Sequence, residues 1–285
     1  AIAAVLVGVV RLAAWFTWAR RVRRTRFAEA NGYVYDEPAD DVGGRYPGTA
    51  FSVGSSRSRD ESFRTVDPPF VEFGRYQWTV GSGKSRRTYR IGFAAMRIER
   101  PLPHMVLDAR GNNGIFGAGI IPFSFDRDQV LSLEGDFDRF FTLYCPADYE
   151  RDALYVFTPD VMALLIDEAA LLDVEIVDDW VFLYSTTPFD LDDPSTWRRL
   201  HRIDDTLVAK LRRVAGRYRD DRVAGQDAVV LETLSPSSPT SQPSPARRRY
   251  VVGQEGRRLR RSPPWLAVAV VGVLAAFWIA AQILR

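Results

Sequence analysis

The chain has few of the residues that build disulfide frameworks and zinc sites. Its 285 residues include one cysteine, Cys145, and two histidines, His104 and His201. A single cysteine excludes a disulfide within the chain, which suits a reducing compartment. Three such residues are also too few for a four-ligand Cys/His zinc site, so we expect no bound metal ion and no other cofactor.

Motifs of nucleotide binding and nucleophilic catalysis are absent as well. The sequence GSGKS at 81–85 resembles the end of a phosphate-binding loop, but that motif requires glycine where Trp78 stands. A helix must follow such a loop, whereas a strand pattern follows here. No GxSxG nucleophile motif occurs in the chain. We therefore expect residues 81–85 to form the turn of a β-hairpin.

Charges of opposite sign are separated along the chain. Residues 1–26 hold six arginines and residues 247–285 hold eight, out of 38 basic residues in all. All but one of the 36 acidic residues lie between these segments, so residues 27–246 carry a net charge of −11 although the whole chain carries +2. An acidic body argues against nucleic-acid binding. The basic arms favour contact with anionic lipid headgroups, at roughly 1 kcal/mol per basic residue near the surface.

Two hydrophobic segments lie beside the basic arms. Residues 265–284 contain one polar side chain, Gln282, and twenty helical residues rise about 30 Å, the thickness of the hydrocarbon core of a bilayer. Residues 1–19 are apolar except for Arg11 and Thr17. We predict transmembrane helices at 1–19 and 265–284, with a basic juxtamembrane helix at 20–30.

Tryptophans and arginines concentrate at the membrane–water interface of membrane proteins. Because both arginine clusters lie on the inner side of their segments, the positive-inside rule predicts a two-span cell-membrane protein whose central domain is cytoplasmic and whose termini face outward. The predicted interface residues are Arg11, Trp15, Trp18, Arg20, Arg21, Arg23, Arg24, Arg26, Arg257, Arg258, Arg260, Arg261 and Trp265.

The first segment is short of a full span if Arg11 marks the interface. Residues 1–10 rise about 15 Å, half of the hydrocarbon core. We therefore expect the native chain to begin upstream of Ala1. The alternative is a span of 1–19 in which Arg11 snorkels to the interface or pairs with another chain.

The central segment predicts an α+β domain at 31–220, with a mostly antiparallel sheet and segregated helices. Strand patterns occur at 71–80, 88–100, 104–109, 129–133, 141–144, 153–157, 174–177 and 180–184. The first two and the last two of these are expected to pair as hairpins. Helix patterns occur at 158–172 and 193–218, each opened by a capping residue and a proline. Residues 36–69 are expected to be loop-rich, and 221–264 to form a Ser/Pro-rich and then Arg-rich linker.

One pair of polar residues, His104 and Asp108, is a candidate catalytic site. Residues 104 and 108 of a strand share a face, and a histidine–carboxylate pair can act in general acid–base catalysis. The alternative is a hydrogen-bonded strand end before a turn at 111–114. Of the other polar residues, His201 is expected at the surface and Cys145 packed at a strand end. We expect Asp193 to cap a helix, because the calcium-loop pattern lacks its glycine and glutamate.

Three segments carry a resemblance to a known family: LPHMVLDARGNN at 102–113, LEGDFDRFFTLYCPADYERDALYVFTPDVMALLID at 133–167 and EIVDDWVFLYS at 175–185. They resemble an actinobacterial family of membrane proteins to which no activity is assigned. The block at 135–165 is also similar to a widespread bacterial domain of unknown function found beside membrane spans. The resemblance covers most of 27–218 and implies a membrane location, with no functional residues to carry over.

Together these observations favour an interaction or sensing module held at the membrane. One alternative is a membrane-tethered enzyme with a pocket near His104 and Asp108. The other is an accessory subunit of a transport or envelope complex. The expected partners are anionic lipid headgroups and either another protein or a second copy of the chain, with no nucleic acid.

Overall fold

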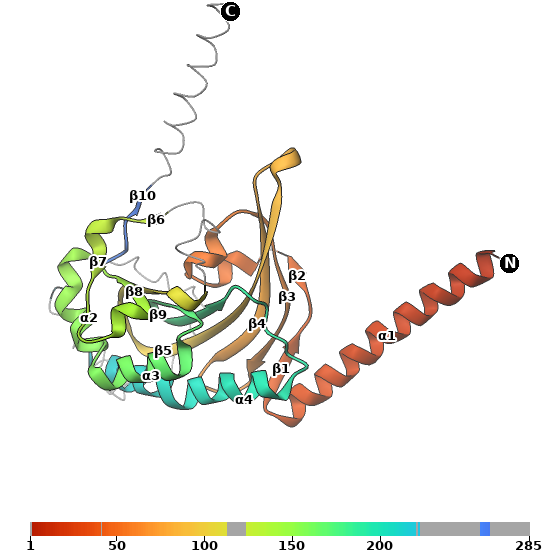
Figure 1. Cartoon of the computed structure of the whole chain (residues 1–285). Coiled ribbons are helices and arrows are strands. Elements are labelled where there is room, and N and C mark those ends of the chain that lie inside the picture. The colour runs from red at the N-terminus through yellow and green to blue at the C-terminus, as the bar shows by residue number, and fades with distance from the viewer. Residues whose placement is uncertain (1, 41, 113–123, 221, 223–256, 263–285) are drawn as a thin grey trace, which may run out of the picture.

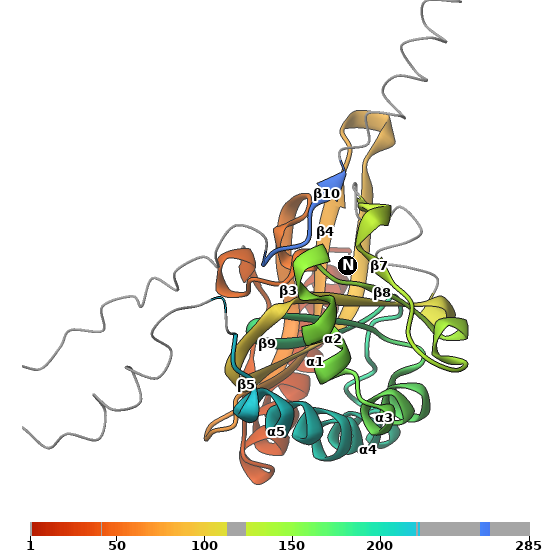
Figure 2. The same ribbon diagram turned by 90° about the vertical axis from the view of Figure 1, so that its left-hand side faces the viewer.

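An eight-stranded antiparallel sheet with helices on one face forms the body of the protein (Figures 1 and 2). The computed structural model describes residues 2–40, 42–112, 124–220, 222 and 257–262. The strand order is β1-β3-β4-β5-β8-β7, with β2 beside β3 and β9 beside β5; β6 and β10 form a separate pair. The α+β class and the antiparallel sheet predicted from the sequence are therefore confirmed.

The elements have the following bounds. The strands are β1 Tyr33–Asp36, β2 Ala39–Asp40, β3 Ser55–Thr65, β4 Val71–Val80, β5 Arg87–Ala109, β6 Ser124–Phe125, β7 Val130–Leu131, β8 Phe141–Tyr144, β9 Asp173–Ser185 and β10 Arg261–Ser262. The helices are α1 Ile2–Ala30, α2 Glu150–Val156, α3 Pro159–Ala169, α4 Pro194–Ile203 and α5 Ala209–Arg217, with a π-helical turn at Asp204–Val208 between the last two.

Local sequence signals predict some of these elements well. β4 and β5 form the predicted hairpin around 81–85, where Val80 pairs with Arg87. α3 begins at Pro159 as expected, and α4 begins at Pro194. The Asp193 carboxylate caps α4, because its Oδ1 accepts a hydrogen bond of 2.9 Å from the Ser195 amide. The predicted capping role of Asp193 is thus confirmed.

Two long strands, β5 and β9, run side by side through the sheet. β5 continues through Pro101 and Pro103, and β9 continues through Asp178, so the predicted strand breaks and the predicted hairpin at 174–184 are wrong. The two strands shift register relative to each other at this level. The prolines are tolerated because the ladder is irregular there, with two register shifts between residues 97 and 105 of β5.

A bulge at Asp178 explains why β9 looks like two strands in the sequence. Asp178 has a φ of +53°, in the left-handed region. Before it, Val174 and Ile176 face the core on the helix side; after it, Val181 and Leu183 do. The helix-facing positions change from even to odd numbers, which breaks the period of two that marks a single strand.

The predicted loop at 36–69 contains strand β3, whose polar run SSRSRDES lacks the alternation of apolar residues that marks a strand. β3 lies between β1 and β4, where its charged side chains pair across the sheet. Arg64 bonds Asp36 of β1 at 2.9 Å, and Arg75 of β4 bonds Glu61. Cross-strand pairs of opposite charge replace the apolar alternation that normally marks a strand.

The predicted strand at 153–157 is wrong, because these residues lie mostly in helix α2. Ala153 and Val156 are buried, whereas Leu154 and Tyr155 between them are exposed. A spacing of three residues is that of a helix face, and the run of five apolar residues at 153–157 hides it.

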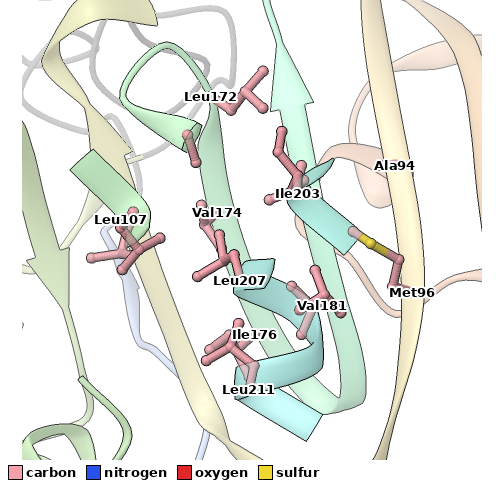
Figure 3. Packing of buried hydrophobic residues seen from close by; sticks show 14 of the residues in the cluster. Ala94, Met96, Leu107, Leu172, Val174, Ile176, Val181, Ile203, Leu207 and Leu211 are labelled. Atoms are coloured by element: carbon pink, nitrogen blue, oxygen red, sulfur yellow. The ribbon is translucent and has the colours of Figure 1, made fainter. Parts of the chain in front are cut away.

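The main core lies between the sheet and the helices (Figure 3). β9 contributes Val174, Ile176 and Val181 to this layer, and they meet Leu207 and Leu211 of the helical segment. Figure 2 shows α3, α4 and α5 together on this side of the sheet. Leu200, Ile203, Leu207 and Leu211, all within the predicted helix at 193–218, are buried on this side.

The opposite face of the sheet carries an aromatic layer covered by two chain segments. Tyr46 and Phe51, from the short helical segment at 42–52, pack on Phe182 of β9 at ring distances of 5.8 and 5.5 Å. Residues 257–262 also return to this face, where Leu259 is buried. The folded body therefore extends beyond the predicted limits of 31–220, and the end of the predicted linker at 221–264 belongs to it.

α1 extends away from the body (Figure 1). Its last turns join the core, because Ala28 is fully buried. Between residues 7 and 18 its large apolar side chains, including Trp15, Phe16 and Trp18, are more than half exposed. No helix in the described part of the chain is both long and apolar enough to cross a bilayer. The predicted span at 265–284 lies outside the described residues.

Candidate functional site

A groove of about 690 Å³ opens where α1 meets α4. Ligand pockets of proteins commonly fall between about 300 and 1,000 Å³. The groove is lined by Arg23, Arg24, Phe27, Asn31, Phe63, Leu191, Asp192, Pro194, Trp197, Arg198, His201, Arg202 and Asp205. Segments separated by about 170 residues in sequence therefore meet at one cavity, which we call the α1–α4 groove.

The floor of the groove is aromatic. Phe27 of α1 lies 4.9 Å from the Trp197 ring of α4, and Phe63 of β3 lies 5.0 Å from the same ring. Trp197 is held in place because its indole N–H donates to the Leu191 carbonyl at 3.0 Å. Phe27 remains 38% exposed, so an apolar aromatic surface faces the open side of the groove.

The rim of the groove is basic. Arg23, Arg198 and Arg202 are exposed, and neither Arg23 nor Arg198 has an ion-pair partner within 4.0 Å in the described part of the chain. Arg202 reaches Glu168 only at 3.9 Å. Four arginines against two aspartates line the groove, which therefore attracts anions.

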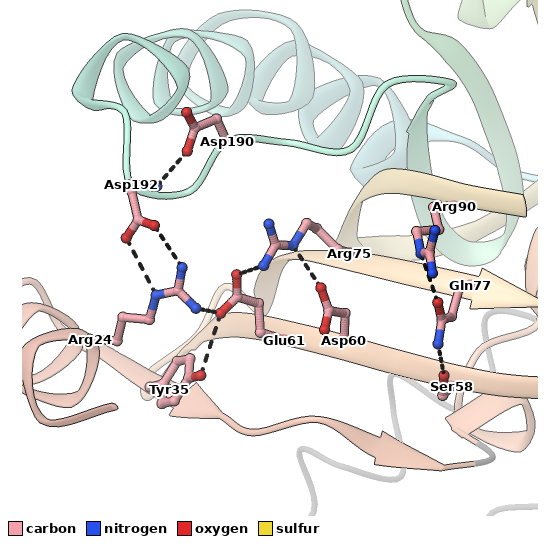
Figure 4. A network of polar contacts seen from close by, with 10 residues as sticks. All are labelled: Arg24, Tyr35, Ser58, Asp60, Glu61, Arg75, Gln77, Arg90, Asp190 and Asp192. Atoms are coloured by element: carbon pink, nitrogen blue, oxygen red, sulfur yellow. Dashed lines mark hydrogen bonds and ion pairs between the residues drawn. The ribbon is translucent and has the colours of Figure 1, made fainter. Parts of the chain in front are cut away.

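Arg24 locks α1 to the domain beside this groove (Figure 4). It is only 6% exposed, and its guanidinium pairs with Glu61 of β3 and with Asp192, at 2.8 Å for the latter. The Arg24 hydrogen bond lowers the pKa of Asp192 below its usual range, against the opposing effect of burial. Glu61 is also bonded by Arg75 and, at 3.4 Å, by the Tyr35 hydroxyl. A buried arginine with two carboxylate partners fixes the direction in which α1 leaves the body.

His201 lies at the edge of the groove, exposed as predicted. Its Nε2 is 3.5 Å from the Tyr33 hydroxyl, and its ring lies 6.0 Å from that of Trp197. Burial, with Asp204 and Asp205 nearby, raises the pKa of Tyr33 to about 12. Tyr33 therefore stays a neutral hydroxyl near His201 at physiological pH.

His104, the histidine singled out by the sequence, does not pair with Asp108 but with Glu175 of β9. Its Nε2 lies 2.8 Å from Glu175 Oε1, and its Nδ1 accepts a hydrogen bond from the Leu259 amide at 3.4 Å. Because Nδ1 accepts this bond, the proton of the imidazole lies on Nε2, and the Nε2–H donates a hydrogen bond to Glu175. His104 is 4% exposed and both its nitrogens are engaged, which fits the structural alternative for this residue rather than acid–base catalysis.

Glu175 is the centre of this buried cluster. Its Oε2 accepts hydrogen bonds from the Thr49 amide at 2.8 Å and the Tyr184 hydroxyl at 2.7 Å, and its Oε1 accepts from Thr49 Oγ1 at 2.5 Å. Burial would raise the pKa of Glu175, but the hydrogen bonds that it accepts from His104, Thr49 and Tyr184 lower it overall. The cluster joins the 42–52 segment, β5, β9 and the returning 257–262 segment, and Asp108 is not part of it.

Asp108 lies on β5 opposite Thr142 of β8. Burial raises the pKa of its carboxyl, with Arg110 acting in the opposite direction. Cys145 is buried as predicted, and its thiol lies 3.3 Å from the Pro146 carbonyl. Within the described segments, no group of three or more His, Cys, Asp or Glu side chains is placed to hold a metal ion.

The predicted interface arginines fall into two groups. Arg11, Arg20, Arg23 and Arg26 are exposed on α1, as is Arg21, which pairs with Glu37 at 2.5 Å. Arg24 and Arg257 are buried in the body, so the interface assignment does not hold for these two side chains.

The returning segment accounts for the remaining predicted interface residues. Arg257 donates to the Pro101 carbonyl at 2.7 Å, and Arg258 pairs with Asp178. The backbone amide of Arg260 bonds Gln129 at 2.7 Å, and Arg261 opens β10. Trp265 lies outside the described residues.

The sequence gives only faint signals of the α1–α4 groove. Arg23 and Phe27 are four residues apart, as are Trp197 and His201, so each pair lies on one helix face. Nothing in the sequence indicates that these two faces meet. The partner of His104, Glu175, is equally hidden 71 positions away.

Comparison with known proteins does not place the chain in a family. No family model matches the chain, and no curated protein sequence matches it. Among solved structures, the chain is similar to the crystal structure of the mycobacterial trehalose monomycolate transport factor A, TtfA, at 14% sequence identity and a TM-score of 0.42. That alignment covers 70% of this chain and 97% of the other.

Proposed function

We propose that the protein is a membrane-anchored interaction module whose α+β domain is held in a fixed orientation at the inner membrane surface. The observation that carries this proposal is the buried Arg24. It ties α1 to β3 through Glu61 and to the segment before α4 through Asp192. A helix that merely trailed from the domain would not need a buried double ion pair at its base.

The exposed surface of α1 supports a membrane contact. Trp15, Phe16 and Trp18 expose more than half of their surface, and exposed apolar patches usually mark interaction or membrane surfaces. Arg20, Arg23 and Arg26 follow within two turns, each adding roughly 1 kcal/mol near an anionic surface. The body as a whole, at −11 for residues 27–246, is repelled by the same surface, so the basic arms are the segments expected to lie nearest the lipid.

The second membrane segment of this proposal is 265–284. It follows within a few residues the returning segment 257–262, which is docked on the body through Leu259 and β10. Both proposed membrane segments therefore connect to the domain through elements that pack on it. Such an arrangement suits a module that presents one surface to a partner, whereas His104 and Glu175, sealed in the core, are poorly placed to meet a substrate.

Fractionation and topology reporters test the proposal. The full-length protein is expected to stay with the membrane pellet after an alkaline carbonate wash. A reporter active only outside the cytoplasm should be silent when inserted at 235–245 and active when fused after Arg285. Release of the protein by carbonate, or the reverse reporter pattern, contradicts the proposal.

A further inference from the structure

We propose that the α1–α4 groove binds one molecule of an anionic membrane phospholipid, with an acyl chain on its aromatic floor and the phosphate on its arginine rim. The proposal rests on the proposed membrane location, which supplies the ligand. It is carried by the groove itself, which combines an apolar floor and a basic rim in a cavity of about 690 Å³.

The floor selects an apolar group. Phe27, Phe63 and Trp197 pack edge-on or tilted within 5.8 Å of one another, and Phe27, which is 38% exposed, supplies most of the ring surface open to a ligand. Trp197 has its only N–H turned inward to Leu191, which leaves this part of the floor without a donor for a polar ligand. An alkyl chain buries against such a surface at about 25 cal/mol per Å² removed from water.

The rim selects an anion. Asp192, one of the two carboxylates in the lining, is already paired with Arg24 at 2.8 Å. Arg23 and Arg198, from the two walls, have no ion pair within the described segments and can turn their guanidinium groups to a common phosphate. Arginine presents paired N–H donors that match phosphate oxygens, so two or three arginines make a strong phosphate site.

The geometry of α1 points to the bilayer as the source of this ligand. Arg23 follows Trp18 by five residues, which is about 7.5 Å along the helix axis. The headgroup layer on each side of a bilayer is roughly 5–7 Å deep. If Trp18 lies at the edge of the hydrocarbon core, the arginine rim lies at the level of the lipid phosphates.

Photo-crosslinking tests the proposal in the full-length protein. The protein, in dodecyl maltoside micelles, is mixed with phosphatidylglycerol that carries a diazirine near the middle of one acyl chain. After irradiation, mass spectrometry maps the labelled residues. A second arm uses phosphatidylcholine with the same labelled chain. Label is expected on Phe27, Phe63 or Trp197, several-fold more with phosphatidylglycerol than with phosphatidylcholine.

Matched charge variants separate the rim from general attraction. Arg198→Glu with Arg202→Glu should lower groove labelling at least tenfold. The control, Arg199→Glu with Arg213→Glu, makes the same charge change at exposed arginines outside the groove lining and should leave it unchanged. Phe27→Ala, at a partly exposed position, should lower it several-fold.

Three outcomes overturn the proposal: label confined to the hydrophobic ends, equal labelling by the two lipids, or equal loss in the variant and its control. A protein that resists carbonate but takes no label in the groove refutes the lipid site alone. A protein that carbonate releases refutes the membrane location itself.

Discussion

Replacing Glu175 by glutamine tests whether the buried cluster around it holds the fold together. The carboxylate accepts four hydrogen bonds, two on each oxygen. In glutamine one oxygen becomes an NH2 group. The hydroxyl on that side, of Thr49 or Tyr184, can turn to accept from it, but the N–H donor on that side, of His104 Nε2 or the Thr49 amide, then faces another donor. His104 cannot adapt by moving its proton to Nδ1, because that nitrogen accepts from the Leu259 amide.

The magnitude follows from the lost bond and from the donor left without an acceptor. A hydrogen bond to a charged group contributes about 1.5–3 kcal/mol, and a buried donor left unsatisfied costs about 1–3 kcal/mol. We therefore expect Glu175→Gln to lower the free energy of unfolding by about 3–5 kcal/mol. For a domain of this size the melting temperature should fall by roughly 6–20 °C.

Near-UV circular dichroism of the full-length protein in micelles measures this change, with thermal and urea unfolding at pH 7. Glu134→Gln is the control, because Glu134 is exposed and should stay within about 0.5 kcal/mol of the parent. The lowered pKa of Glu175 means that its contribution is fully present above the unfolded-state value of about 4.3 and is lost as the pH falls below it. A loss under 1 kcal/mol at pH 7, or a difference that does not shrink in acid, would refute the reasoning.

Three further predictions rest on other features. Burial, with Glu150 and Asp152 nearby, raises the pKa of Cys145 from 9.0 to about 12. At pH 8 the thiolate fraction is therefore about a thousandfold lower than in the unfolded chain, and alkylation by iodoacetamide should be slower in the folded protein than in urea by a similar factor. Fast labelling of the folded protein would contradict the burial. Arg24→Ala should lower the free energy of unfolding by about 3 kcal/mol, because buried Glu61 loses a partner. Arg21→Ala removes an exposed pair with Glu37 and should change the free energy of unfolding by less than 1 kcal/mol. Equal urea midpoints for the two variants would contradict a stabilising role for the Arg24 ion pairs. A fragment of residues 31–220 should melt below one of 20–262, because it lacks Ala28 and Leu259 of the two cores; coincident melting curves would show that these segments add no stability.

The sequence predicts elements whose signals are local. The 81–85 turn and the Asp193-Pro194 helix start are each set by a few neighbouring residues, and both are found. β9 is different, because the backbone turn at Asp178 depends on a partner strand that shifts register at the same level. The periodicity of either strand alone cannot reveal an irregularity that the two strands create together.

The candidate site is harder still to predict. The groove joins Phe27 to Trp197, and the polar cluster joins His104 to Glu175, across long stretches of chain. The sequence identifies His104 as unusual but assigns it the wrong carboxylate. Asp108 is close in sequence, whereas Glu175 is brought close only by the pairing of β5 with β9.

Because Arg24 fixes the base of α1 to the body, the helix and the body turn together. From Ala28 to Ile2 the helix is about 39 Å long, so a tilt of about 10° at its base moves the far end by about 7 Å. In the proposed membrane orientation, a change in bilayer thickness that tilts α1 therefore turns the whole body with it, because Arg24 fixes the base of the helix to β3 and to the segment before α4. Spin labels at residues 12 and 198 should then report the same distance in thin and thick bilayers, and a distance that changes with thickness would mean that the base of α1 is not fixed.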